Sequence, residues 1–183
     1  GFPVPGTDIK ILDIETGTEE LAQGEDGEIA ICGPQVMQGY WNKPAETEAV
    51  FRTINGNRYF LTGDIGHIDE DGFIVITDRK KDLILVGGFN VYPREVEDII
   101  FTHPKVALAA IVGIPDEKSG ERAKAFVQLK AGESATKEEL LDFCKENMAG
   151  YKRPKEIEFR DELPVSPVGK VLRRVLRDEE LKE

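Results

Sequence analysis

Lys170, near the carboxyl end of the chain, stands in a segment that could aim one ammonium group. Pro164 and Pro167 lack a backbone N–H and interrupt any regular ladder before it, while Gly169 allows a tight turn. A lysine supplies a compact positive charge with three hydrogen-bond donors. The segment therefore predicts an ordered but movable loop that presents this charge, with a solvated loop lysine as the alternative.

Two further motifs could bind a polar ligand. Asp64 ends a Thr-Gly-Asp run after an apolar strand, and a carboxylate at a strand end can accept hydrogen bonds from two neighbouring hydroxyls. Gly87 and Gly88 follow an apolar run over 83–86, and glycine lets a backbone approach a ligand closely. Taken alone, both motifs are also typical of turns.

Four segments carry a resemblance to a known superfamily. In order and approximate spacing they resemble the carboxyl-terminal motifs of the adenylate-forming enzymes, which include acyl-CoA synthetases, peptide-synthetase adenylation domains and luciferases. The resemblance covers essentially the whole chain. The sequence NVYPREVE is more similar to the acyl-CoA synthetase branch than to the peptide-synthetase branch. The four segments are GEIAICGPQVMQGYWNKPAET (27–47), YFLTGD (59–64), DRKKDLILVGGFNVYPREVE (78–97) and LPVSPVGKVLRRVLR (163–177).

The resemblance implies roles for single residues. Lys170 matches the lysine that bridges the substrate carboxylate and the α-phosphate during adenylation. Asp64 matches a carboxylate that binds the nucleotide ribose, and Arg79 would reach the ribose or phosphate region as a charged fork. Lys81 matches the hinge between a large and a small domain. Gly88 matches a loop that lines the channel for the phosphopantetheine arm of coenzyme A.

The resemblance also suggests a weaker site and a set of cofactors. Lys152 is a candidate for a coenzyme A phosphate contact, with a solvated loop lysine as the alternative. Position 85 is Leu where some relatives carry a lysine active in the second half-reaction, so that role is not carried over. ATP, Mg²⁺ and coenzyme A are expected in the full-length enzyme, and we assign no residue of this chain to a metal.

We expect the chain to be the carboxyl-terminal part of a longer enzyme. It begins at Gly1 and lacks the Ser/Thr/Gly-rich phosphate loop of the superfamily and its Tyr-Gly-x-Thr-Glu-like stretch. The full enzyme would be an acyl-CoA synthetase that uses ATP and coenzyme A to convert a carboxylic acid, a fatty or aryl acid, into acyl-CoA through acyl-AMP. The fragment alone is expected to be inactive, with no tightly bound cofactor. Alternatives are adenylation that feeds a carrier protein or an oxygenation, and a non-catalytic interaction module that keeps the fold.

Composition and charge set further bounds. Of 183 residues, 40% are hydrophobic and 32% charged, as in folded soluble proteins. The net charge of −11 argues against non-specific nucleic-acid binding, although residues 81–183 hold 18 of the 24 Lys and Arg residues, which would suit a polyanion such as coenzyme A. No apolar run approaches the roughly 20 residues of a membrane span. Cys32 and Cys144 have no metal-like spacing, so free thiols and a cytoplasmic location are expected.

The apolar patterns predict an α+β fold in two domains, residues 1–80 and 81–183. The first reads as short antiparallel strands between Gly and Asp-Gly turns, with one helix over 44–51. We interpret it as a small barrel-like subdomain, and the resemblance implies that it ends a large amino-terminal domain.

The patterns over 81–183 favour a compact α+β domain, and the resemblance implies that this domain is mobile. Pro93 opens a helix that Pro104 ends, and strands are expected over 106–114 and 123–130. Thr136 and Glu139 have the spacing of a capping box for a helix that Gly150 would stop. The last helix is amphipathic and basic, and the arginines of its polar face are taken as solvated: Arg173, Arg174 and Arg177.

Overall fold

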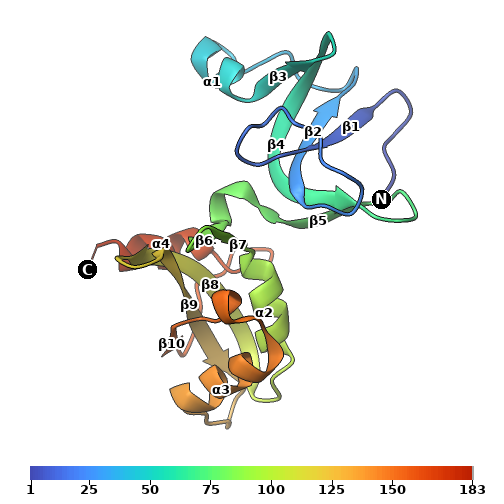
Figure 1. The fold of residues 1–183 in the computed structure, drawn as a ribbon. Coiled ribbons are helices and arrows are strands. Elements are labelled where there is room, and N and C mark those ends of the chain that lie inside the picture. The colour runs from blue at the N-terminus through green and yellow to red at the C-terminus, as the bar shows by residue number, and fades with distance from the viewer. Residues whose placement is uncertain (183) are drawn as a thin grey trace. The chain divides into compact units, whose positions relative to one another are not determined.

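A computed structural model describes residues 1–182 and divides the chain into two compact units, one over Gly1–Lys81 and one that begins at Asp82. Each unit is built on a five-stranded sheet (Figure 1). Within the described residues, no helix is long and apolar enough to cross a membrane.

The first unit is an antiparallel sheet with one short helix. Its strands lie in the order β1-β2-β4-β3, and β5 pairs with β4 on the same side as β3. Tyr59, Leu61, Leu12 and Ala30 form a buried cluster in this unit. The elements are β1 (Asp8–Leu12), β2 (Gly27–Cys32), α1 (Pro44–Ala49), β3 (Phe51–Ile54), β4 (Asn57–Ile68) and β5 (Ile74–Arg79).

This sheet is open, so the antiparallel strands were predicted correctly but their barrel-like closure was not. The long strand β4 pairs with β3 along its first part and with β5 along its second part. Strand β1 stands at the other edge, where it pairs with β2. Because closure depends on pairing between distant edges, the local patterns that predict each strand do not determine it.

The second unit combines a mixed sheet with three helices. Its strands lie in the order β10-β9-β6-β7, with β8 paired to β9, and all pairs are antiparallel except β9 with β10. Short 3₁₀ turns cover Lys80–Asp82 and Gly150–Lys152. The elements are β6 (Ile84–Val86), β7 (Phe89–Val91), α2 (Pro93–Phe101), β8 (Val106–Asp116), β9 (Gly120–Leu129), α3 (Lys137–Asn147), β10 (Glu156–Phe159) and α4 (Arg173–Glu180).

Helices cover both faces of this sheet because β8 and β9 alternate their apolar side chains. Ile111 of β8 and Ala125 of β9 face the core formed with α2 and α3. Val112 and Phe126, one position further along each strand, face the core that contains Leu176 of α4. Figure 1 shows α2 and α3 away from α4, with the sheet between them.

The ends of α3 and α4 refine the predictions from sequence. The Thr136 hydroxyl accepts the Glu139 N–H at 3.1 Å, so the expected cap is confirmed. The expected stop at Gly150 is wrong, because α3 ends at Asn147, Met148 is extended, and Gly150 begins the 3₁₀ turn. Helix α4 begins at Arg173, so the apolar residues Val171 and Leu172 precede the helix.

Candidate functional site

Asp64 lies on a bulge inside β4, and not at a strand end as the sequence suggested. Ala30 of β2 pairs with Leu61, whereas Glu28 pairs with Ile65, so β4 carries extra residues at this point. Gly63 has a φ of 72°, a value that favours glycine. The Asp64 N–H donates to the Thr62 hydroxyl at 3.1 Å. The Thr-Gly-Asp run therefore forms a β-bulge, a feature that re-aims side chains at functional sites.

Asp64 and Arg79 form the first pair of candidate site residues. They are partners in the β4–β5 register, and Arg79 Nε lies 2.6 Å from Asp64 Oδ1. Their side chains are 24% and 58% exposed, so solvent reaches both. The backbone N–H of Arg79 donates to Asp78 Oδ1 at 2.8 Å. The bulge and the neighbouring strand thus present a carboxylate and a guanidinium together.

Lys81 lies between two residues that are ion-paired within their own units. On one side, Lys80 Nζ lies 2.7 Å from Glu28 Oε2, and the Glu28 side chain is only 4% exposed. On the other side, the Asp82 carboxylate lies 3.4 Å from Arg173 Nη1. The exposed Lys81 is the last residue of the first unit.

Gly88 lies in a two-residue turn between β6 and β7. Val86 pairs with Phe89, and Gly87 and Gly88 have φ values of 59° and 85°. A two-residue hairpin turn with positive φ at both central positions favours glycine at each of them, which explains the two consecutive glycines. A Cβ atom built on either glycine would meet nothing within 4 Å. The turn is therefore open to a ligand on the side where Gly88 lacks a side chain.

Lys152 lies beside this turn but is already paired. Phe89, next to Gly88, stacks on Tyr151 with ring centroids 4.8 Å apart, which brings the hairpin to the 3₁₀ turn that holds Lys152. Lys152 Nζ lies 2.5 Å from Glu95 Oε1. Burial disfavours the charged amine, but the hydrogen bond and charge of Glu95 raise the pKa of Lys152 overall. A phosphate at this position would have to share the ammonium with Glu95.

Lys170 is exposed at the tip of a loop that is closed by hydrogen bonds. The Ser166 N–H donates to the Lys170 carbonyl at 2.7 Å, and the Gly169 N–H donates to the Ser166 carbonyl at 2.8 Å. The Lys170 N–H in turn donates to the Ser166 hydroxyl at 3.1 Å. Gly169 has a φ of 79°, so the turn needs a glycine at this position. Ser166 thus shapes the loop, which presents the ammonium to solvent.

Arg173, three residues after Lys170, was misjudged from sequence. Arg173 was taken as solvated, but its side chain is only 20% exposed and its guanidinium forms a two-pronged ion pair with Glu97. Glu97 lies next to Val96 in the buried stripe of α2. An acidic residue within a buried stripe is a signal that a basic partner must cover it. Arg174, by contrast, is 89% exposed, as expected.

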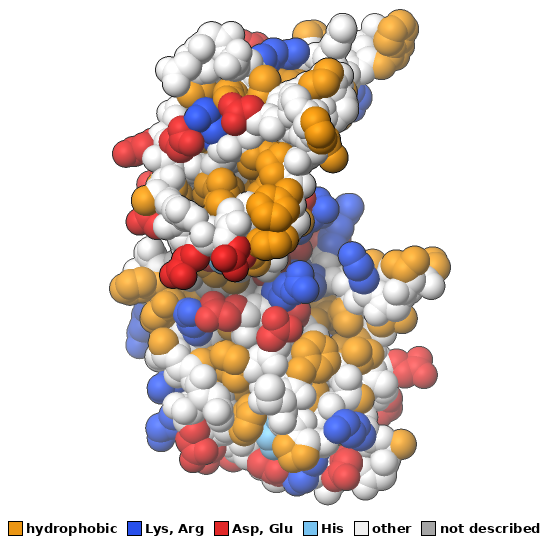
Figure 2. All heavy atoms as spheres, turned by 90° about the vertical axis from the view of Figure 1, so that its right-hand side faces the viewer, with side chains coloured by type: hydrophobic (Ala, Val, Ile, Leu, Met, Phe, Trp, Pro, Cys, Tyr) orange, Lys and Arg blue, Asp and Glu red, His pale blue; other side chains and the backbone are white. Residues whose placement is uncertain are grey.

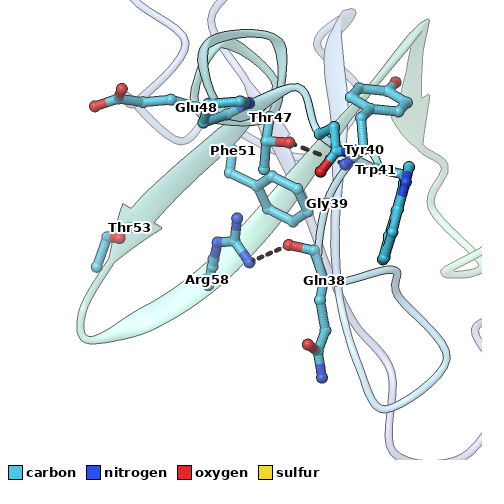
Figure 3. A pocket seen from close by; sticks show the side chains of 11 residues that line it. Gln38, Gly39, Tyr40, Trp41, Thr47, Glu48, Phe51, Thr53 and Arg58 are labelled. Carbon is cyan, nitrogen blue, oxygen red and sulfur yellow. Dashed lines mark hydrogen bonds between the residues drawn. The ribbon is translucent and has the colours of Figure 1, made fainter.

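The first unit also contains a hollow of about 860 Å³ that sequence analysis did not predict. Figure 3 shows Arg58 beside Phe51, where the guanidinium carbon lies 3.6 Å from the ring centroid, and Arg58 donates to the Gln38 carbonyl. The Trp41 side chain is 89% exposed. The lining residues fall within 38–58, so the hollow does not include Asp64 or Arg79.

Charged side chains of both signs lie on the face that Figure 2 presents, where acidic and basic side chains are interspersed. Anion binding would therefore depend on single residues such as Lys170 and Arg79. Among residues 1–182, no three or more His, Cys, Asp or Glu side chains gather in a way that could hold a metal ion.

Comparisons with known proteins agree with these motifs. Residues 1–41 match the AMP-binding enzyme family, and residues 95–170 match the AMP-binding enzyme C-terminal domain. The chain is 52% identical over 182 residues to a long-chain-fatty-acid–CoA ligase of Yersinia pestis, covering 100% of this chain and 31% of that relative. The chain belongs to the AMP-binding enzymes.

Two solved structures share the fold of this chain. ATP-bound MatB from Rhodopseudomonas palustris matches 98% of this chain and 35% of its own, with 39% identity and a TM-score of 0.90. The o-succinylbenzoate-CoA synthetase MenE of Bacillus subtilis, in complex with an acyl-adenylate intermediate, matches 97% of this chain and 35% of its own, with 40% identity and a TM-score of 0.81. This AMP-binding enzyme sequence therefore spans about a third of each of these relatives.

Proposed function

We propose that the chain is the carboxyl-terminal part of an ATP-dependent acid–thiol ligase that converts a fatty acid into its acyl-CoA. The main support for this proposal is the 52% identity to a long-chain-fatty-acid–CoA ligase across the whole chain. The exposed Lys170 loop and the Asp64–Arg79 pair support it, because each presents the charge that the reaction needs. In this proposal the activity is that of a longer enzyme.

In the proposed first half-reaction, a carboxylate oxygen of the acid attacks the α-phosphorus of ATP, and pyrophosphate leaves. Asp64 accepts hydrogen bonds from the ribose hydroxyls, and Arg79 holds the ribose or phosphate region. Lys170 lies between the acid and the α-phosphate, where its ammonium offsets the charge of two anions that must meet. Mg²⁺, bound with ATP, would neutralise phosphate charge, and we assign none of the described residues to it.

In the proposed second half-reaction, the second unit rotates about Lys81, so that Lys170 leaves and Gly88 approaches. The open side of the Gly87-Gly88 turn then lines the path of the phosphopantetheine arm. The coenzyme A thiolate attacks the acyl carbonyl, a thioester forms, and AMP leaves with the bonding electrons. Lys152 is a further candidate for a coenzyme A phosphate, in competition with Glu95.

The test uses the full-length enzyme with a panel of carboxylic acids. We expect pyrophosphate release that depends on a fatty acid, followed by acyl-CoA formation when coenzyme A is added. The isolated 183-residue chain should release no pyrophosphate above a heat-inactivated control. Adenylation without transfer to coenzyme A would favour a carrier-protein or other acceptor, and full-length protein without adenylation would favour a non-catalytic module. The cytoplasmic location stays a prediction.

A further inference from the structure

Arg173 begins α4 three residues after Lys170, and its guanidinium turns into the second unit. Its Nε and Nη2 donate to the two oxygens of Glu97 at 2.8 and 2.5 Å. Such a two-pronged pair fixes the planes of both groups as well as their distance. Its Nη1 also donates to Asp82 Oδ2 at 3.4 Å. Arg173 therefore joins the start of α4 to two residues that lie 76 and 91 positions earlier in the sequence.

Glu97 is a firm partner because the protein holds it from several sides. It belongs to α2, and its side chain is only 11% exposed. Its Oε1 also accepts the backbone N–H of Ile111 in β8 at 2.9 Å. A buried carboxylate that lost its guanidinium would keep an uncompensated charge. The Arg173–Glu97 pair is thus an anchor within the unit and differs from an exposed salt bridge.

The hydrogen bonds within the Lys170 loop fix its conformation, but they do not fix its position on the second unit. The bonds between Ser166, Gly169 and Lys170 close the loop on itself, and the Leu172 N–H donates to the Pro164 carbonyl at 2.8 Å. The base of the loop is held by Leu163 and Val171, which pack in the core that contains Leu176, and by the Leu163 N–H, which donates to Gln128 Oε1 at 3.3 Å. The first ion pair after Lys170 in the chain is the one made by Arg173, and the far end of α4 is held by the pairs of Glu179 with Arg160 and of Glu180 with Lys124.

We propose that Arg173 is a positioning residue for Lys170, a role that rests on the proposed adenylation reaction. By fixing the first residue of α4 against Glu97, the guanidinium sets where Lys170 lies on the second unit. Asp82 directly follows Lys81, so the same guanidinium links the lysine loop to the first residue beyond the proposed hinge. A rotation at Lys81 then carries Asp82, Arg173 and Lys170 together.

The informative variant is Arg173→Lys. A lysine keeps the positive charge near Glu97 but replaces a planar fork by a single ammonium on a flexible stem. The buried carboxylate stays compensated, so the fold should survive, while the position of the loop becomes less defined. A misplacement of about 1 Å can cost on the order of a hundredfold in rate.

Both half-reactions are measured on the full-length enzyme. Pyrophosphate release from acid and ATP reports adenylation, and thioester formation from supplied acyl-AMP reports the second step. For Arg173→Lys we expect adenylation to fall by about tenfold or more and thioester formation by less than about twofold. The matched control is Arg174→Lys, on the adjacent exposed residue, which should change neither rate.

A double variant tests whether Arg173 acts through Lys170. If it does, adding Arg173→Lys to Lys170→Ala should cause no further loss of adenylation, because the positioned group is already gone. Multiplicative losses would overturn the proposal. So would equal losses in both half-reactions, or an unchanged rate of adenylation in Arg173→Lys alone.

A folding failure of Arg173→Lys would not leave the question open. Asp82→Asn leaves the Glu97 contacts in place and weakens only the link to the segment after the hinge, so it should give the same selective loss at about twofold to fivefold. Unchanged adenylation in that variant would overturn the proposal. If the wild-type enzyme shows no adenylation, the proposed function is refuted. If the wild type is active and Lys170→Ala loses adenylation as expected, but Arg173→Lys adenylates at the wild-type rate, only the positioning role is refuted.

Discussion

Asp64 and Arg79 face each other in the register of β4 and β5, and the Arg79 Nε lies 2.6 Å from Asp64 Oδ1. A carboxylate offers acceptor sites on two oxygens, so it can bind a guanidinium and ligand hydroxyls at the same time. The bulge at Thr62 to Asp64 makes this possible, because it turns the side chain of a residue within a strand toward a charged neighbour.

Asp64→Asn should weaken the use of ATP by the full-length enzyme. The amide keeps the shape of the carboxylate but replaces one acceptor oxygen by a donor that faces Arg79. We expect the KM for ATP to rise by about tenfold or more, with a smaller change in kcat. Asp71→Asn, on an exposed residue of the β4–β5 turn, is the control. An unchanged KM would show that the pair is structural.

Lys170→Ala should separate the two half-reactions. If the ammonium acts only while the carboxylate and the α-phosphate react, adenylation should fall by about a hundredfold or more. Thioester formation from supplied acyl-AMP should change little, and so should the melting temperature, because the side chain is exposed. Lys118→Ala, another exposed lysine, is the control. Equal losses in both steps would contradict the assigned role.

Gly88→Asn should give the opposite separation. Asparagine tolerates positive φ better than other side chains, so the turn should form while a side chain occupies the open side. We expect thioester formation to fall by about tenfold or more with adenylation unchanged. Gly87→Asn is the matched comparison, because Gly87 has the same open surroundings and shares the turn. Equal effects of the two variants would assign the loss to turn strain.

Trypsin should cut the chain first after Lys81. Lys80 is half-buried and forms an ion pair with Glu28, and Asp82 forms one with Arg173. The exposed Lys81 therefore lies between two ion-paired residues. Boundaries between domains usually fall in such exposed stretches. Mass spectrometry should identify products 1–81 and 82–183 as the first fragments, and Lys81→Gln should delay their appearance. Early cleavage elsewhere, with 78–82 protected, would count against a mobile junction.

Sequence patterns predicted those features that depend on neighbouring residues. The capping of α3 by Thr136 follows from contacts within one turn, and the start of α2 at Pro93 follows from the fixed φ of proline. The role of Arg173 could not be predicted in this way, because its partner Glu97 lies 76 residues earlier in the sequence. The open edge of the first sheet was missed for the same reason.

In the candidate site, too, the sequence motifs identified single residues but not the contacts between residues distant in sequence. The motifs located Asp64, Arg79, Gly88 and Lys170, but the pairing of Asp64 with Arg79 and of Lys152 with Glu95 required the sheet register and the fold of the second unit. These pairings matter for function because they decide how much charge each residue can offer a ligand. Their roles in catalysis stay predictions that the variants above test.

Tyr59 should make the stability of the first unit depend on pH in the alkaline range. Its side chain is 1% exposed, and its hydroxyl donates to Asp8. Burial, together with this hydrogen bond, raises the pKa of Tyr59 from 10.0 to about 12. Because the folded-state pKa lies above the unfolded value, the contribution is complete below pH 10 and is lost as the pH rises toward 12.

The measurement compares the wild-type chain with Tyr59→Phe in urea and follows unfolding by far-ultraviolet circular dichroism, because the single tryptophan, Trp41, is already 89% exposed in the folded chain. At pH 8 the variant should be less stable by about 1 kcal/mol, since it loses the bond to Asp8. Between about pH 9.5 and 11.5 the wild type should lose about 2 kcal/mol relative to the variant, because phenylalanine has no proton to release from the unfolded state. Tyr151→Phe, on an exposed ring of the second unit, should leave the wild-type pH dependence intact. A wild-type to Tyr59→Phe difference that stays constant over this range would show that the Tyr59 hydroxyl titrates normally and that its burial does not hold the proton.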